Sequence, residues 1–268
     1  MLQPVRDGHI HTPYCPHGSA DTFSMYVEEA VRQNLHTITF TEHAPLPHGF
    51  EDPVPEQNSA MDEAKLADYF QELRLLKKEY SQAITILAGL EVDFIEGYEK
   101  ETEQFLNEIG PDMDDSILSV HFLRTAAGYI CLDYSPDSFE KLIEACASSR
   151  QAAKLYYDTL LQSINQPLGP FKPRRIGHMT LAAKFQHKFS GDWTPHPLIE
   201  TVLDAVHKQG LELDYNGAGT AKVFCREPYP PDWVIKEAKK RGIPLVYGSD
   251  AHQARDLGQG IGRMLLST

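Results

Sequence analysis

The chain has 268 residues, with 25 Lys and Arg against 38 Asp and Glu, which gives a formal net charge of −13 at pH 7. This charge argues against a nucleic-acid backbone as the main partner, because proteins that bind one usually carry a basic stripe. No apolar run approaches the ~18 residues of a membrane helix and no apolar stretch precedes a cleavage site, so we expect a cytoplasmic protein with no membrane partner.

Short apolar runs alternate with amphipathic stretches along the whole chain, which indicates repeated β/α units around a parallel sheet. Strands are expected at residues 5–11, 37–41, 84–90, 117–121, 175–178, 211–216 and 244–249, and helices at 22–33, 65–79, 98–109, 139–165, 198–208 and 232–241. Asp21-Thr22 before the first helix and Gly210 after the fifth are typical boundary signals. No Gly/Ser/Pro-rich linker divides the chain, so we expect residues 1–268 to form one domain.

Two connections are unusually long. Residues 44–61 contain four prolines and the acidic residues Glu51, Asp52 and Glu56, and could form a lid or wall over a site, or a solvated linker. Residues 122–134 hold Ala127-Gly128 between two apolar runs, which is typical of a hairpin on the same face.

Polar residues are concentrated where the expected strands end. Within Asp7-Gly8-His9-Ile10-His11 the period of a strand points His9 and His11 to one side. Other strand ends or the loops behind them supply His17, Glu42, His43, Glu91, His121, His178, Asp250 and His252. The sixth strand ends in Asp214-Tyr215-Asn216, with no obvious ligand, and Cys15 is interpreted as a bystander.

Strand ends of a barrel converge on one face, and imidazole and carboxylate are ligands of borderline divalent metals such as Zn, Mn and Fe. The pattern therefore predicts a metal site. The remaining histidines scatter through the chain and are assigned to the surface or to loops: His36, His48, His187, His196 and His207. The irregularly spaced cysteines contain no CxxC and indicate neither a disulfide framework nor a zinc ribbon.

These motifs resemble those of a known family. DxHxH, TEH at 41–43, GLE at 89–91, SVHF at 119–122, IGH at 176–178 and SDAH at 249–252 are similar, in order and over the whole chain, to the motifs of the PHP superfamily, named for polymerase and histidinol phosphatase. The chain length and the phrases SVHFL and GSDAH most resemble the histidinol-phosphate phosphatases of histidine biosynthesis. The resemblance implies an α/β fold, a distorted (β/α)7 TIM-like barrel of the PHP type, that holds up to three metals.

The resemblance also divides the candidate ligands among the metals. It implies a first metal at His9, His11, Glu91 and Asp250, a second at Glu91, His121 and His178, and a third at His17, His43 and His252. Glu91 would bridge two metals, which a carboxylate can do and a neutral imidazole cannot. Asp7 and Glu42 are candidates to support an imidazole ligand from behind, although Asp7 could equally be a residue that only starts the strand.

Two basic residues are implied to bind the substrate phosphate. Histidinol phosphatases often follow the GH with an Asp-containing phrase and a basic residue six positions on, and here Thr180 occupies the Asp position and Lys184 the basic one. The second is Arg226, in the loop after the sixth strand. Lys184 could instead be an ordinary surface lysine, and it lacks the bidentate fork of arginine.

The expected enzyme is a phosphatase with two to three divalent metal ions (Zn, Mn or Fe), in which a metal-bridging hydroxide attacks L-histidinol phosphate. Glu91, Asp250 and His252 are the expected catalytic residues, and Asp250, His252 or a metal-bound water could protonate the leaving alkoxide. The acidic residues of the 44–61 loop would bind the amine of this small-molecule substrate. Alternatives are a PHP phosphoesterase acting on phosphotyrosine or nucleotides, a metal-dependent amidohydrolase, or a protein that only holds metal. The amidohydrolase is disfavoured because no expected strand ends in the lysine that bridges metals there. The sequence leaves the oligomeric state open.

Overall fold

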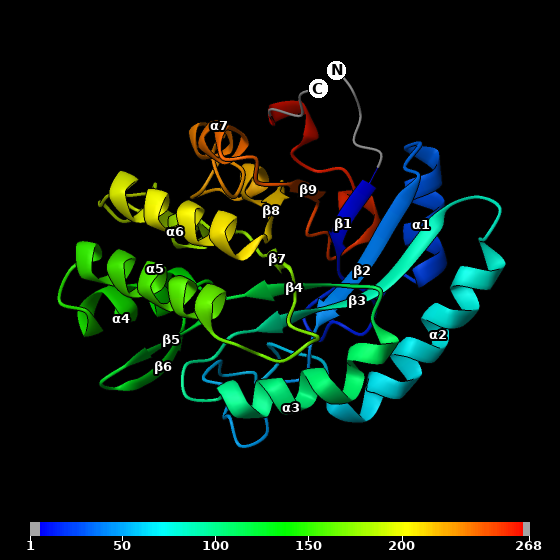
Figure 1. The fold of residues 1–268 in the computed structure, drawn as a ribbon, viewed down its shortest axis with the longest axis horizontal. Helices are drawn as coiled ribbons and strands as arrows, with labels where there is room; N and C mark the ends of the chain where they lie inside the picture. Colours follow the sequence, from blue (N-terminus) through cyan, green and yellow to red (C-terminus); the bar gives the residue numbers. More distant parts are fainter. Residues whose placement is uncertain (1–5, 265–268) are drawn as a thin grey trace.

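Seven parallel strands form the centre of the computed structural model, which describes residues 6–264 (Figure 1). They are β1 Arg6–Ile10, β2 Thr37–His43, β3 Thr85–Asp93, β4 Asp115–Ser119, β7 Arg175–Ile176, β8 Glu212–Asn216 and β9 Leu245–Gly248, neighbours in that order. The first and last strands meet where the Asp250 N–H donates to the His9 carbonyl at 2.7 Å, so the sheet is a nearly closed barrel. All seven predicted strands are confirmed; Val5, the expected start of the first, lies outside the described residues.

Helices cover the outside of this barrel (Figure 1). They are α1 Phe23–Arg32, α2 Leu66–Glu79, α3 Glu99–Ile109, α4 Pro136–Ala145, α5 Ser149–Asn165, α6 His196–Gln209 and α7 Asp232–Lys240. The predicted single helix at 139–165 is wrong, because Ala147 has a φ of 62° and Ser148 begins a new helix by accepting a hydrogen bond from the Gln151 N–H. Within residues 6–264 no helix combines the length and apolar character needed to cross a membrane.

The two long connections pack against each other. β5 Phe122–Thr125 and β6 Gly128–Cys131 form the predicted hairpin. The ring of Phe50, from the 44–61 loop, lies 5.1 Å from that of Phe122 and 5.0 Å from that of Tyr129, and Val54 is buried in the same small core. The 44–61 loop is therefore a packed wall beside the carboxyl ends of the strands.

A buried arginine fills the opposite end of the barrel. The Arg175 side chain is fully buried and pairs with Asp115, which Arg6 contacts from the other side. A Cβ on Gly8 would lie 2.2 Å from Arg175 Nη1. The packing of Arg175 leaves no room for a side chain between Asp7 and His9, which explains the glycine in the first motif.

Candidate metal centre

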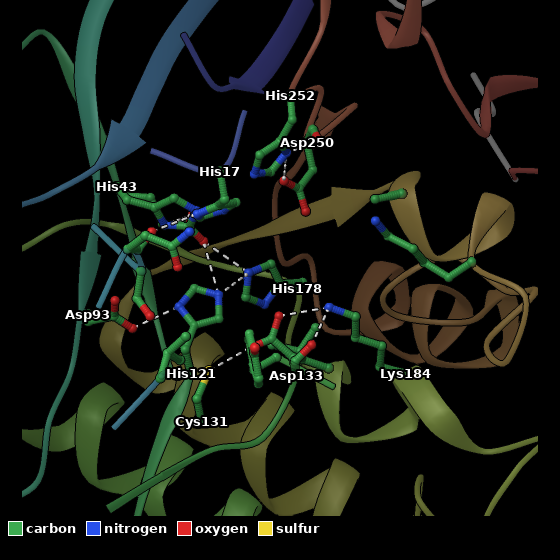
Figure 2. A pocket seen from close by; sticks show the side chains of 18 of the residues that line it. His17, His43, Asp93, His121, Cys131, Asp133, His178, Lys184, Asp250 and His252 are labelled. Carbon is green, nitrogen blue, oxygen red and sulfur yellow. Dashed lines mark hydrogen bonds and ion pairs between the residues drawn. The ribbon is translucent and has the colours of Figure 1, made fainter. Parts of the chain in front are cut away.

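The predicted ligands converge at the carboxyl ends of the strands, on a cavity of about 600 Å³. Figure 2 shows many of them pointing into it. The cavity is lined by His17, His43, Glu91, His121, His178, Asp250 and His252 among others, and also by Lys184. His9 and His11 are fully buried at its base and contact Glu91 and Asp250. All nine residues proposed as ligands thus lie together, although they span most of the chain.

Glu91 lies at the centre of the group, at the end of β3. Its Oε2 is 3.3 Å from His9 Nε2, 3.5 Å from His11 Nε2 and 3.2 Å from His43 Nδ1. Its Oε1 is 2.9 Å from His178 Nε2 and accepts a hydrogen bond from Ser119 Oγ at 2.6 Å. The two oxygens therefore face two different sets of imidazoles, which is the geometry that a bridging carboxylate needs.

Carboxylates hold three imidazoles from behind. His9 Nδ1 donates to Asp214 Oδ2 at 2.8 Å, and His121 Nδ1 donates to Asp93 Oδ1 at 2.8 Å. His11 Nδ1 lies 3.3 Å from Glu42 Oε1, in the arrangement proposed for Glu42. A proton held at Nδ1 leaves Nε2 as an electron-pair donor, and in each of these residues Nε2 faces a carboxylate at the base of the cavity.

Several buried donor atoms at this base have no hydrogen-bond partner in the described structure: His9 Nε2, His11 Nε2 and His43 Nδ1. A buried polar atom without a partner costs free energy, so a ligand is needed to satisfy it. Ligand atoms of His9, His11 and Asp250 lie within 4.8 Å of one another, as do those of Glu91, His121 and His178. These two groups have the chemistry and spacing of the first two metal sites that the resemblance implies, so the residues fit divalent metals.

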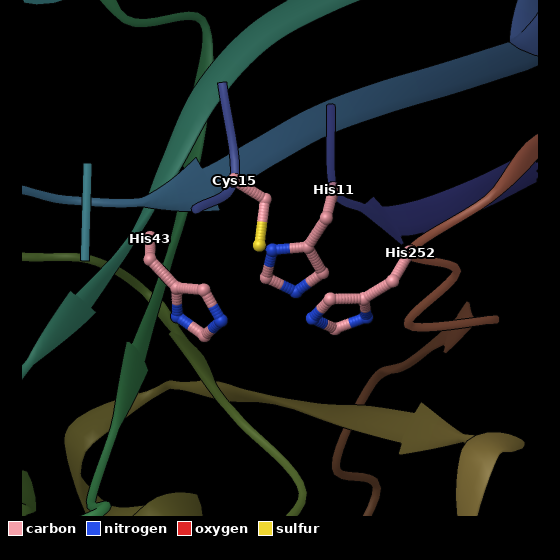
Figure 3. A group of neighbouring side chains, drawn as sticks. All are labelled: His11, Cys15, His43 and His252. Atoms are coloured by element: carbon pink, nitrogen blue, oxygen red, sulfur yellow. The ribbon is translucent and has the colours of Figure 1, made fainter. Parts of the chain in front are cut away.

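The third group differs from the expected His17, His43 and His252: it keeps His43 and His252, includes His11 and Cys15, and does not include His17. Figure 3 shows Cys15 beside His11, His43 and His252, and ligand atoms of these four lie within 4.8 Å of one another. The buried thiol of Cys15, which was interpreted as a bystander among the histidines, lies inside this group. The His17 ring lies 5.1 Å from that of His43 and 5.2 Å from that of His252, with Nδ1 donating to the Asn58 carbonyl.

The electrostatics of the base demand positive charge. Burial raises the pKa of Glu91, but His9 and His178 outweigh burial and hold the pKa well below its usual range. Burial lowers the pKa of His11, but Asp250 and Glu42 outweigh it and raise the pKa to about 9. The carboxylates are thus ionised and require a cation close by, a role that protons on the imidazoles or divalent metals can fill.

Lys184 lies in the cavity wall and points to Asp133 (Figure 2). Its Nζ donates to Asp133 Oδ2 at 2.9 Å and to the Asp133 carbonyl at 2.7 Å. Burial lowers the pKa of Lys184, but the Asp133 carboxylate outweighs burial and raises it above its ordinary value. Lys184 is therefore a fixed positive charge inside the cavity.

Other predicted placements require correction. Arg226 is exposed, donates from Nε to the Val223 carbonyl at 2.9 Å and is not among the residues that line the cavity; Lys222, from the same loop, lines it instead. The backbone of a loop, which sequence does not specify, decides which of its side chains turns inward. Asp7 contacts no imidazole through a hydrogen bond among the described residues, and its Oδ1 accepts from the Ser249 and His9 N–H groups.

The acidic residues of the 44–61 loop divide in the same way. Glu56 lines the cavity, whereas Asp52 accepts hydrogen bonds from Val54 N and Ser59 N and shapes the loop itself. Glu51 is exposed and does not line the cavity. The five histidines assigned to the surface or to loops are all exposed, as expected: His36, His48, His187, His196 and His207.

Sequence reasoning missed the residues that support the ligands. Asp93, Asp214 and Asp133 lie in none of the motifs, Ser119 appeared only as the first residue of SVHF, and Asp214 belongs to the strand that was judged to supply no obvious ligand. The available signal was their position at strand ends, where any buried carboxylate faces the same site. A buried carboxylate there is as informative as a histidine, because it needs a cationic or N–H partner.

The sequence of this chain matches known families. The PHP domain family matches residues 7–218, and the PHP-associated family matches residues 233–262; both segments supply strands to the one sheet. A histidinol-phosphatase of Bacillus subtilis is 50% identical over 255 residues, which cover 94% of this chain and 95% of that protein.

Solved structures that are similar to this fold include two of histidinol phosphatases or a candidate for one. One, of HisK from Listeria monocytogenes, a candidate histidinol phosphatase, has a TM-score of 0.92 and 37% identity and covers 96% of this chain and 99% of its own. The other, of a Lactococcus lactis histidinol phosphate phosphatase with Zn, L-histidinol and phosphate, has a TM-score of 0.67 and 19% identity over 93% of this chain and 86% of its own. At that identity it supports the fold alone.

Proposed function

This chain belongs to the PHP domain family, and we propose that it is a metal-dependent phosphatase. We propose that it hydrolyses L-histidinol phosphate to L-histidinol and phosphate. The observation that carries the proposal is the convergence of nine imidazole and carboxylate side chains on one cavity, around Glu91. The 50% identity to a histidinol-phosphatase over nearly the whole chain favours this substrate within the family. The reaction would serve histidine biosynthesis, and we propose that it takes place in the cytoplasm.

We assign two to three divalent metals, Zn, Mn or Fe, to the three side-chain groups. His9, His11 and Asp250 would hold the first, Glu91, His121 and His178 the second, and His43, His252 and His17 the third, with Cys15 beside them. Bound there, the metals supply Lewis acidity and a hydroxide at neutral pH. Glu91 would join the first two groups, because its two oxygens face them separately.

The chain's own residues prepare the site for a phosphate monoester. Lys184, held by Asp133, presents a positive charge in the cavity wall, where it would bind a nonbridging phosphate oxygen. Burial raises the pKa of Asp250, but His9 and His11 outweigh it and hold the pKa well below its usual range. Asp250 is thus ionised and accepts protons. Burial and the neighbouring His11 hold the pKa of His252 well below its usual range, which leaves a bound water to protonate the leaving alkoxide.

The cavity itself favours a small molecule over a macromolecular partner. Its volume of about 600 Å³ lies within the range of ligand pockets. One wall is the 44–61 loop, whose Val54, Glu56, Asn58 and Ser59 line it. That loop is packed by Phe50 against the β5–β6 hairpin, so the pocket is formed before a substrate binds.

The test compares kcat/KM for L-histidinol phosphate, an aryl phosphate and a nucleoside monophosphate at equal metal loading. We expect L-histidinol phosphate to lead by about 100-fold or more, equivalent to ~2.7 kcal/mol of discrimination. A lead by the nucleotide or by phosphotyrosine would contradict the substrate and leave the metallophosphatase intact. No turnover of any of the three by metal-loaded protein would contradict the activity itself.

A further inference from the structure

The carboxylates that line the cavity differ in whether they contact a cationic or imidazole side chain. Six acidic residues face it: Glu56, Glu91, Asp93, Asp133, Asp250 and Asp256. Four of them contact a cationic or imidazole partner: Glu91 and Asp250 lie against ligand imidazoles, Asp93 against His121 and Asp133 against Lys184. These four belong to the metal centre or to the lysine that we assign to phosphate.

The other two carboxylates are held by neutral groups. Glu56 Oε2 accepts a hydrogen bond from Tyr134 Oη at 2.7 Å, and Asp256 Oδ2 accepts one from Gln253 Nε2 at 2.7 Å. Within the part of the chain that the structure describes, neither has a Lys, Arg or His within ion-pair distance. Each hydrogen bond orients a carboxylate without pairing it with a cationic side chain.

Both side chains come from segments with fixed positions. Glu56 follows Val54, which is buried in the small core between the 44–61 loop and the β5–β6 hairpin. Asp256 ends a turn of 3₁₀ helix, Ala254–Asp256, whose first residue donates its N–H to Asp21 at 2.8 Å. The carboxylates are therefore presented by a formed wall, which limits the entropy lost when they bind a ligand.

Side chains of both charges line the cavity. Lys184, held by Asp133, and Lys222 are the lysines that line it, whereas Glu56 and Asp256 are carboxylates held by neutral hydrogen-bond donors. We propose that Glu56 and Asp256 bind the cationic amine of the substrate and so select phosphate monoesters that carry a positive charge near the ester. This inference rests on the proposed function and adds the residues that recognise the rest of the substrate.

L-Histidinol phosphate has this chemistry, because its ammonium group is on the carbon next to the ester-bearing CH₂. Phosphotyrosine in a peptide and nucleoside monophosphates have no ammonium at that position. The product L-histidinol keeps the ammonium, so its binding reports on the same two carboxylates without turnover. Discrimination by charge needs a carboxylate that is not already paired with a cation. The four other acidic residues of the cavity do not meet this condition, because each contacts an imidazole or a lysine.

The experiment uses the double variant Glu56→Gln/Asp256→Asn, which keeps shape and hydrogen bonds and removes both charges. Its matched control is Glu51→Gln/Glu63→Gln, with the same change in net charge at exposed residues that do not line the cavity. The substrates are L-histidinol phosphate and its amine-free analogue imidazolylpropyl phosphate, at equal measured metal content. Calorimetry measures the affinity of each metal-loaded protein for L-histidinol.

We expect the cavity variant to lose about tenfold or more in kcat/KM for L-histidinol phosphate and a similar factor in L-histidinol affinity, the size of a charge-assisted hydrogen bond. Its loss toward the amine-free analogue should be less than about twofold, and the control variant should match the unmodified chain with both substrates. Equal losses toward both substrates, or none, would overturn the inference. Failure of the unmodified protein to hydrolyse L-histidinol phosphate while it hydrolyses an aryl phosphate would instead overturn the proposed substrate.

Discussion

Asp214→Asn tests whether the metal centre depends on the carboxylate behind His9. Asp214 is fully buried, and its Oδ2 accepts from His9 Nδ1 at 2.8 Å, Asn216 Nδ2 at 3.0 Å and the His178 N–H at 3.4 Å. Its Oδ1 faces Gly248, where a Cβ would come within 2.3 Å of it. Asparagine is the substitution that fits this space, and it removes the charge with little change in volume.

The expected loss follows from what the amide cannot do. The amide oxygen can still accept from His9, but without a charge it makes a weaker bond to the imidazole and lowers the basicity of Nε2. Loss of such a supporting partner costs about 10- to 100-fold in metal affinity, or ~1.4–2.7 kcal/mol. The Asn216 amide, which also donates to Asp250 Oδ2 at 3.2 Å, would lose part of its own orientation.

The assay is metal affinity by competition with a chromogenic chelator, with circular dichroism to establish that the variant is folded. Asp204→Asn is the control, because its side chain is 69% exposed and pairs with Arg241 on the outside of the barrel. An affinity of Asp214→Asn within about twofold of the unmodified chain would refute the assignment of Asp214 as the residue that positions His9.

Two further predictions use the barrel interior and the cavity wall. Gly8→Ala should lower the free energy of unfolding by about 1–3 kcal/mol, because the added Cβ would meet the buried Arg175 guanidinium. The control Gly262→Ala should change this free energy little, because no atom lies within 4 Å of its added Cβ. Urea titration of both variants measures the difference. Lys184→Met keeps the aliphatic stem and removes the charge, and kcat/KM should fall about tenfold or more while metal content stays the same. Unchanged kcat/KM in that variant would remove Lys184 from phosphate binding.

The order of the main strands and helices could be predicted from hydrophobic period and capping residues, with most bounds correct to within a few residues. Thr22 before α1 and Gly210 after α6 are in their expected positions. The break between α4 and α5 was missed because Ala147 adopts a left-handed conformation that alanine seldom takes. Ser148, whose side chain caps α5 by accepting from the Gln151 N–H, was the local signal for a new helix.

The ligand residues that lie at strand ends could be predicted to come together in one site. His9, His11, Glu91 and His178 follow from one rule, that strand ends of a barrel share a face. Asp214 did not, because its contact with His9 joins positions 205 apart in sequence and only the closed barrel brings them together. Arg226 was placed wrongly for a different reason, since the direction of a loop side chain depends on backbone angles such as its φ of 65°.

The central claim, that this chain hydrolyses L-histidinol phosphate with metals held by its clustered imidazoles and carboxylates, is tested most directly by a metal titration. Chelator-treated protein receives increasing equivalents of Zn or Mn, and phosphate release from L-histidinol phosphate is measured at each step. We predict no release by the metal-free protein and a rise that saturates as the side-chain groups fill, with no recovery in His9→Ala/His11→Ala. Release by the metal-free protein at the rate of the loaded protein would contradict the claim.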